Sequence, residues 1–254
     1  MKIGANHPVE IAFVSIAVLL VACAAVARTF FQPAPSHRIN DNVYAIRCLF
    51  VNFYAVNTRV GVVLFDAGPN SRLAAFGLGS VGIAATAVTH IFLTHSDSDH
   101  AGGIAAFPNA TVYISEAEVQ MIDGTTPRFK RAGLRSSHNK PLDNYEPLRN
   151  GQVMHVGGSR IQTLVTPGHT PGSTTYLVNG SYLVTGDLLR MSKRGEVSPF
   201  FKALNMDHEK SMKSLKDVLP IAEASDFILS GHTGAYKILP SDRGRHFNSG
   251  RHFR

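Results

Sequence analysis

Between residues 43 and 232 the chain consists of short apolar runs separated by polar or glycine-containing breaks. The runs are rich in Val, Tyr, Phe, Ile and Thr, the residue types that favour strands. This pattern predicts a strand-rich fold. The expected strands cover residues 43–51, 52–58, 60–68, 88–95, 111–114, 160–167, 173–178, 181–187 and 226–232.

Helical patterns interrupt the strands in a few places. Residues 71–79 are expected to form a short helix or loop, and residues 101–107 can open a helix. A helix over 115–122 starts from a serine that is a good N-cap, and a longer helix is expected over 207–219. Residues 123–151 have few periodic apolar positions, so we expect a long excursion of the kind that is often functional.

The N-terminal stretch 11–27 is apolar and uncharged, and Lys2 precedes it. It is short for a membrane span, and Ala25-Val26-Ala27 has the small-x-small pattern that signal peptidases accept. We predict that residues 1–27 are a signal peptide or a membrane anchor. The protein would then be exported to a bacterial periplasm, or anchored in the inner membrane facing the periplasm. Lipoprotein processing at Cys23 is a third alternative.

The rest of the chain divides into three predicted parts. Residues 28–42 form a linker, residues 43–240 form one folded domain of ordinary composition, and residues 241–254 form a basic tail. The tail contributes +3 of the net charge of +7, from four Arg against one Asp. Because the remaining excess is dispersed, the sequence argues against a nucleic-acid partner, although anionic lipid or nucleic acid stays a weaker alternative for the tail.

The two cysteines give little scope for disulfide chemistry. Cys23 lies inside the predicted signal, so its removal would leave Cys48 alone. Cys48 stands in an apolar run, where we expect a buried small hydrophobe and not a nucleophile.

The most unusual stretch is THSDSDHAGG, residues 94–103, which places two histidines and two aspartates between His95 and His100. Bringing these lone pairs together is costly unless a positive charge lies among them. A metal ion is therefore the leading interpretation. The alternative is a polar surface turn, because Ser, Asp and Gly favour turns.

Four further acidic or imidazole residues stand just after an apolar strand. They are Asp66, His169, Asp187 and His232. Loops at strand ends are where a rigid scaffold places its chemistry. We therefore expect these four residues to converge with the His95 to His100 cluster on one edge of a sheet.

This ordered set resembles the five motifs of the metallo-β-lactamase superfamily. Asp66 matches the first motif, HSDSDH the second, His169 in TPGHTPGS the third, Asp187 in TGD the fourth and His232 in SGH the fifth. The resemblance implies the α/β class, with an αββα sandwich of mixed sheets and outer helices over residues 43–240. It also implies a site for two metals between the sheet edges.

The same resemblance implies roles for the motif residues. The first metal would be held by His95, Asp97 and His169, the second by Asp99, His100 and His232, with Asp187 bridging both. Asp99 and Asp187 would orient the attacking group, and Asp66 would support the second motif. Two divalent ions are expected, with zinc favoured. Asp97 departs from the usual H-x-H-x-D-H pattern, and because a carboxylate is a harder donor than imidazole, iron and manganese are alternatives.

The expected function is a metal-dependent hydrolase that uses a metal-bridging hydroxide on a small ester, lactone, thioester or related carbonyl substrate. True β-lactamases usually have Cys or Ser where this chain has Asp187, which argues against a β-lactam substrate. The alternatives are a phosphodiesterase or nuclease-type hydrolase, and a di-iron redox or metal-binding protein without hydrolytic turnover. The predicted partners are a small-molecule substrate and, through residues 11–27, a membrane.

Overall fold

The computed structural model describes residues 31–131, 134–136 and 142–242. The predicted export segment at 11–27 and nearly all of the predicted tail lie outside the described residues. By internal contacts the chain divides into compact units of residues 1–32 and 33–254, and the second unit holds every element below. None of the helices within the described ranges has the length and apolar character needed to cross a membrane.

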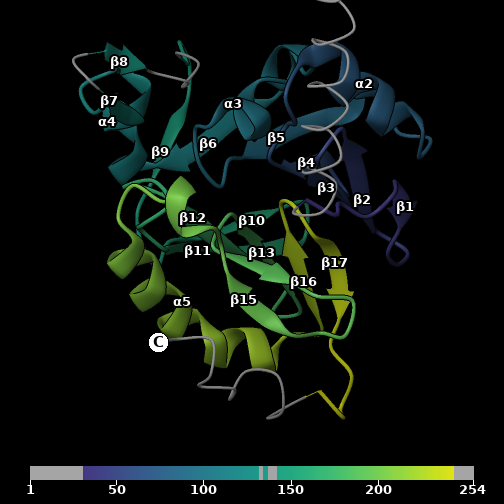
Figure 1. Ribbon diagram of the computed structural model, residues 1–254. Coiled ribbons are helices and arrows are strands. Elements are labelled where there is room, and N and C mark those ends of the chain that lie inside the picture. Colours follow the sequence, from purple (N-terminus) through teal and green to yellow (C-terminus); the bar gives the residue numbers. More distant parts are fainter. Residues whose placement is uncertain (1–30, 132–133, 137–141, 243–254) are drawn as a thin grey trace, which may run out of the picture. The chain divides into compact units, whose positions relative to one another are not determined.

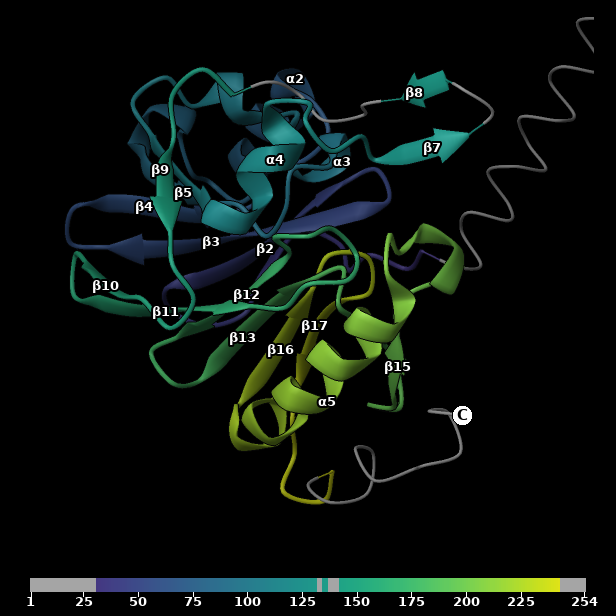
Figure 2. The same ribbon diagram turned by 90° about the vertical axis from the view of Figure 1, so that its left-hand side faces the viewer.

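The second unit is an αββα sandwich, as predicted (Figures 1 and 2). One mixed sheet has the order β1 (His37–Arg38), β2 (Val43–Cys48), β3 (Val51–Thr58), β4 (Gly61–Phe65), β5 (Val88–Phe92), β6 (Thr111–Ser115), β9 (Glu146–Leu148). The other has the order β10 (Val153–Val156), β11 (Ser159–Val165), β12 (Thr174–Val178), β13 (Tyr182–Gly186), β16 (Phe227–Ser230), β17 (Gly234–Lys237).

Helices cover the outer faces of the two sheets. Helices α2 (Ser71–Gly79), α3 (Ser98–Ala101) and α4 (Val119–Ile122) lie on the side of the first sheet, and α5 (His208–Ala224) lies on the side of the second (Figure 2). Two small hairpins complete the described structure, β7 (Phe129–Arg131) with β8 (Leu134–Ser136), and β14 (Leu189–Met191) with β15 (Val197–Pro199).

Alternation of side chains along the strands builds separate cores on the two faces of the first sheet. Successive side chains of a strand point to opposite faces. The face toward the second sheet carries Val43, Ala45, Tyr54, Val56, Val63 and Phe65. The face toward α2 carries Ile46, Cys48, Val51, Phe53, Val62 and Leu64. Cys48 is buried, and burial raises the pKa of its thiol to about 11, so it packs as a hydrophobe, as expected.

Parallel pairing brings the functional strand ends together. Strands β4 and β5 run parallel, so the residues that follow them, Asp66 and the 94–103 stretch, leave the first sheet at the same edge. Strands β13 and β16 also run parallel, which places Asp187 and His232 at one edge of the second sheet. The hydrogen bond from Asn52 N to Gly231 O, 2.6 Å, links the two edges directly.

The structure corrects several predicted boundaries. The strand expected over residues 43–51 ends at Cys48, because Leu49 has a positive φ of 57° and turns the chain into β3. Helix α5 continues to Ala224 through Pro220, and the helix expected over 115–122 is a 3₁₀ turn followed by α4. The excursion at 123–151 contains β7, β8 and β9, which are too short to show a period.

Candidate metal centre

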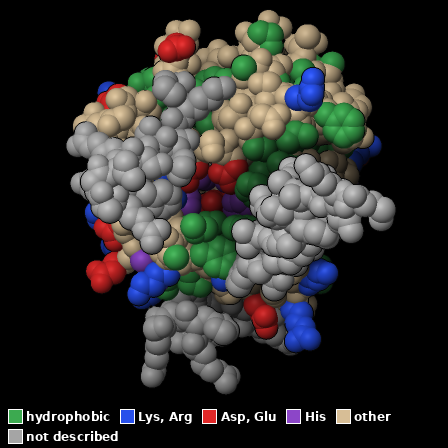
Figure 3. All heavy atoms as spheres, turned by 45° about the horizontal axis from the view of Figure 1, so that its top comes forward, with side chains coloured by type: hydrophobic (Ala, Val, Ile, Leu, Met, Phe, Trp, Pro, Cys, Tyr) green, Lys and Arg blue, Asp and Glu red, His purple; other side chains and the backbone are tan. Residues whose placement is uncertain are grey.

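Loops from both sheets deliver the predicted ligands to one place. His95, Asp97, Asp99 and His100 follow β5 and continue into α3, whereas His169, Asp187 and His232 follow β11, β13 and β16. Their nitrogen and carboxylate oxygen atoms form three groups, each within 4.8 Å. The groups are His95, His100 and Asp187; His95, Asp97 and His169; and Asp99, His100 and His232. Figure 3 shows acidic and histidine side chains inside a hollow bordered by hydrophobic side chains.

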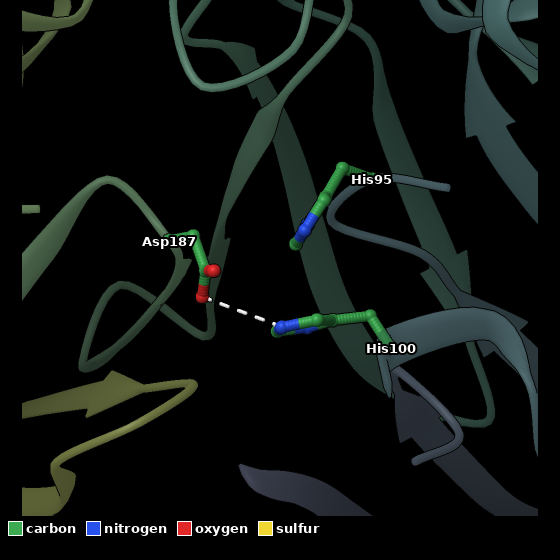
Figure 4. A group of neighbouring side chains, drawn as sticks. All are labelled: His95, His100 and Asp187. Carbon is green, nitrogen blue, oxygen red and sulfur yellow. Dashed lines mark ion pairs between the residues drawn. The ribbon is translucent and has the colours of Figure 1, made fainter. Parts of the chain in front are cut away.

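Asp187 lies between the histidines of the two flanking groups. Its Oδ1 is 3.3 Å from His100 Nε2, and its Oδ2 is 3.2 Å from His232 Nε2 and 3.5 Å from His169 Nε2. Figure 4 shows Asp187 facing the rings of His95 and His100. Burial opposes ionisation of Asp187, but the neighbouring His232 and His100 outweigh it and hold the pKa of this carboxyl well below its usual range. Asp187 is therefore an ionised carboxylate that faces the histidines of both flanking groups.

The other ring nitrogen of each histidine is held by a neighbour. His100 Nδ1 lies 2.8 Å from Asp66 Oδ2, His232 Nδ1 lies 2.8 Å from Phe50 O, and His95 Nδ1 lies 2.9 Å from Thr94 Oγ1. His169 Nδ1 lies 3.2 Å from Asn205 Oδ1. Such partners fix the tautomer and orientation of metal-binding histidines. All four rings consequently present Nε2 to the centre of the cluster.

The donor set fits a divalent metal. Among the described residues, buried side-chain atoms without a hydrogen-bond partner include His95 Nε2, His100 Nε2 and Asp187 Oδ1. Leaving such atoms unsatisfied is costly, and all three face the same point. Imidazole and carboxylate are ligands of zinc, iron and manganese. The structure thus brings together all seven residues predicted to bind metal, while their assignment as ligands stays a prediction.

Asp66 supports the second motif from beneath. Its Oδ1 accepts a hydrogen bond from Thr94 N at 2.7 Å, and Thr94 Oγ1 donates to its Oδ2 at 2.9 Å. The same Oδ2 contacts His100 Nδ1. Asp66 therefore contacts both ends of the 94–100 stretch, and its supporting role stays a prediction.

Another buried carboxylate, Glu118, has no role that the sequence pattern predicts. Its Oε1 accepts hydrogen bonds from Ser96 N and Ser96 Oγ, at 2.9 and 2.7 Å, and its Oε2 accepts from Thr170 Oγ1 and Gly172 N, at 2.8 and 2.9 Å. Ser96 stands between His95 and Asp97, and Thr170 follows His169. Glu118 therefore ties the second motif to the third. The sequence Ser115-x-x-Glu118 has the pattern of a capping box at a helix N-terminus. Glu118 is therefore explained locally in the sequence, and its contacts with Ser96 and Thr170 are not predicted.

We expect Glu118→Ala to destabilise the protein by about 3–5 kcal/mol, because it leaves two buried backbone N–H groups and two hydroxyls without their acceptor. Thermal or urea unfolding in the presence of a chelator measures the loss. Glu116→Ala is the matched control, since Glu116 pairs with the exposed Arg149 and should change stability by about 0.5 kcal/mol or less. Equal stability of the two variants would contradict the structural role of Glu118.

Arg128 is the other residue that the sequence did not single out. It lies in the predicted excursion, just before β7, and only 4% of it is exposed. Its Nε donates to both oxygens of Asp97 at 2.9 Å, and its Nη2 lies 3.1 Å from His169 Nε2. Burial alone would raise the pKa of Asp97, but the contacts with the neighbouring imidazoles and with the Arg128 guanidinium lower it.

Aromatic side chains border the centre. Phe50, at the turn between β2 and β3, stacks on His232 with ring centroids 5.9 Å apart, and Phe200 stacks on the same ring at 5.5 Å. Phe200 also meets His169 edge to face. Leu49 is 57% exposed and Phe50 40% exposed, so the turn offers an apolar surface beside the candidate metal ligands.

Comparisons with known proteins agree with this architecture. The sequence model of the metallo-β-lactamase superfamily matches residues 46–232. Protein YobT of Bacillus subtilis is 29% identical over 77% of this chain and 88% of its own. The N-acyl homoserine lactonase AttM of Agrobacterium fabrum is 28% identical over 57% of this chain and 58% of its own. A B3 metallo-β-lactamase with an active-site glutamic acid has a TM-score of 0.64, at 20% identity, over 86% of this chain and 88% of that one.

The match covers most of the chain, and it begins in β2 and ends at His232, the last of the predicted ligands. The fold, the five motifs and the buried cluster of imidazole and carboxylate groups all belong to this region. The chain is therefore a member of the metallo-β-lactamase superfamily, a metal-dependent hydrolase.

Proposed function

We propose that the protein hydrolyses a small carbonyl ester, with a lactone, an open-chain ester and a thioester as the candidate substrates. The observation that carries this proposal is the position of Asp187, whose two oxygens reach the histidines of both outer ligand groups. Divalent ions held there would polarise a carbonyl oxygen and acidify water. The similarity to the lactonase AttM supports a lactone among the candidates.

The two aspartates that face the centre have different environments. The Asp187 side chain is 5% exposed and surrounded by imidazoles, so it stays ionised and can accept a hydrogen bond from the attacking water. The Asp99 side chain is 24% exposed, with Oδ2 3.4 Å from His232 Nε2 and 3.7 Å from His100 Nε2. Asp99 is therefore the carboxylate nearer to solvent, placed to orient water and to pass a proton to the leaving oxygen or sulfur.

The surroundings of the centre favour a substrate with an apolar part. Leu49, Phe50 and Phe200 form a hydrophobic border on the His232 side. The one arginine that contacts the ligand groups, among the described residues, is Arg128, and its guanidinium is engaged by Asp97 and by backbone oxygens of His169 and Leu204. Because arginine side chains are favoured where a phosphate is recognised, this apolar border fits an acyl compound better than a phosphodiester.

A substrate panel tests the proposal. Purified protein is loaded with zinc, iron or manganese in turn, and turnover of chromogenic esters, lactones, thioesters, a β-lactam and a bis-phosphodiester is measured. We expect kcat/KM for at least one ester, lactone or thioester to exceed that for the β-lactam and the phosphodiester by about 100-fold or more, a factor that corresponds to about 3 kcal/mol of transition-state discrimination. Chelator should abolish the activity. Turnover of the phosphodiester alone would overturn the proposed substrate class.

A further inference from the structure

The two outer ligand groups differ in their charged neighbours. In the group of His95, Asp97 and His169, the Arg128 guanidinium contacts two of the three side chains. In the group of Asp99, His100 and His232, none of the described lysines and arginines forms an ion pair with Asp99. The centre is therefore symmetric in its number of ligands and asymmetric in charge.

Arg128 contacts the atoms that a metal would need. Asp97 Oδ2 and His169 Nε2 lie 3.1 Å apart, and both are within 3.1 Å of Arg128 nitrogens. The guanidinium carries a permanent positive charge, and its N–H groups donate into the same lone pairs that would bind a cation. An ion at this group must displace these hydrogen bonds and approach a buried positive charge.

The guanidinium is held in place independently of Asp97. Nη1 donates to His169 O at 3.1 Å, and Nη2 donates to Leu204 O at 2.7 Å. The Arg128 side chain is 2% exposed, so moving it into water would break contacts on several sides. These bonds keep the positive charge next to Asp97 even when the carboxylate turns toward another partner.

We propose that Arg128 acts as a built-in cation that competes for Asp97 and His169, so that the two metal positions fill unequally. One divalent ion binds tightly at Asp99, His100 and His232, and Asp187 is shared between the two positions. A second ion binds more weakly at His95, Asp97 and His169. We expect its affinity to be lower by roughly 100-fold, because residues that contact metal ligands change metal affinity by up to about this factor. This inference rests on the proposed metal-dependent hydrolysis, and it assigns to Arg128 the control of how many metals the enzyme holds.

Metal titration of the full-length protein tests the inference without any substrate. Chelator-treated protein is titrated with zinc in competition with a chromophoric chelator, and cobalt(II) absorption follows the geometry of each site. Wild type should bind one equivalent tightly and a second one roughly 100-fold more weakly. Arg128→Met, which keeps an unbranched apolar stem and removes the charged guanidinium, should bind two equivalents of similar affinity.

Two further variants complete the experiment. Arg149→Met removes an exposed arginine that pairs with Glu116, and it should titrate like wild type. Arg128→Gln keeps a donor toward Asp97 without the charge, and it replaces Arg128→Met if that variant does not fold. Two tight sites of equal affinity in wild type would overturn the proposed role of Arg128, whatever the variants do. Two sites of unequal affinity in a folded Arg128 variant would overturn it as well. Failure of wild type to bind any metal would instead overturn the metallo-hydrolase itself.

Discussion

Replacing Asp187 with alanine should weaken metal binding at both positions and lower kcat/KM by at least about 100-fold. Loss of a residue that only contacts a metal ligand already lowers metal affinity or activity by about 10–100-fold, and Asp187 faces the metal positions directly. The reason is geometric. Asp187 Oδ1 faces His100, and its Oδ2 faces His169 and His232. Removing one side chain therefore withdraws negative charge from both outer groups at once.

The measurement is metal content after dialysis, combined with zinc affinity and turnover of the best substrate of the panel. Asp187→Asn separates charge from shape, since the amide keeps an oxygen but loses the negative charge, and it should retain part of the affinity. Asp217→Ala is a surface control, because Asp217 pairs with Lys213 on the exposed face of α5 and should behave as wild type. Two tightly bound metals in Asp187→Ala would show that Asp187 does not bridge.

That the candidate ligands lie together could be predicted, because each of these residues has a local signature. Asp66, Asp187 and His232 each follow a run of apolar residues that forms a buried strand. A residue that follows such a strand lies at an edge of the sheet, so its position can be predicted from the apolar pattern. Parallel pairing of β4 with β5 and of β13 with β16 then brings these edges together. The fold class follows from the same pattern.

The partners of the ligands have no such signature. Glu118 contacts Gly172, far along the chain, and Arg128 contacts Asp97 and His169 from a stretch without periodic apolar positions. A buried charge in an irregular segment looks like any surface charge in the sequence, and its partner is defined only by tertiary packing. The length of the 123–151 stretch indicates only that such loops are often functional, and it does not single out Arg128 within the stretch.

The Asp97–Arg128 pair changes what a substitution at the unusual motif position should do. If only the charge of the ligand is considered, Asp97→His should restore the common three-histidine pattern and shift metal preference toward zinc. The structure adds that Arg128 donates to both oxygens of Asp97. In the single variant this guanidinium faces an imidazole in a buried place, where it has lost its counter-ion.

Asp97→His should therefore destabilise the protein by about 3–5 kcal/mol in the presence of chelator, which is the usual cost of leaving one member of a buried ion pair uncompensated. The double variant Asp97→His with Arg128→Met removes that charge, and it should recover most of the stability and show the shift toward zinc. Thermal unfolding of wild type, both single variants and the double variant forms a complete double-mutant cycle, in which the coupling energy is read directly. Coupling near zero would mean that the ion pair contributes nothing to the fold. Zinc preference in the single variant equal to that in the double variant would mean that Arg128 does not compete for this position.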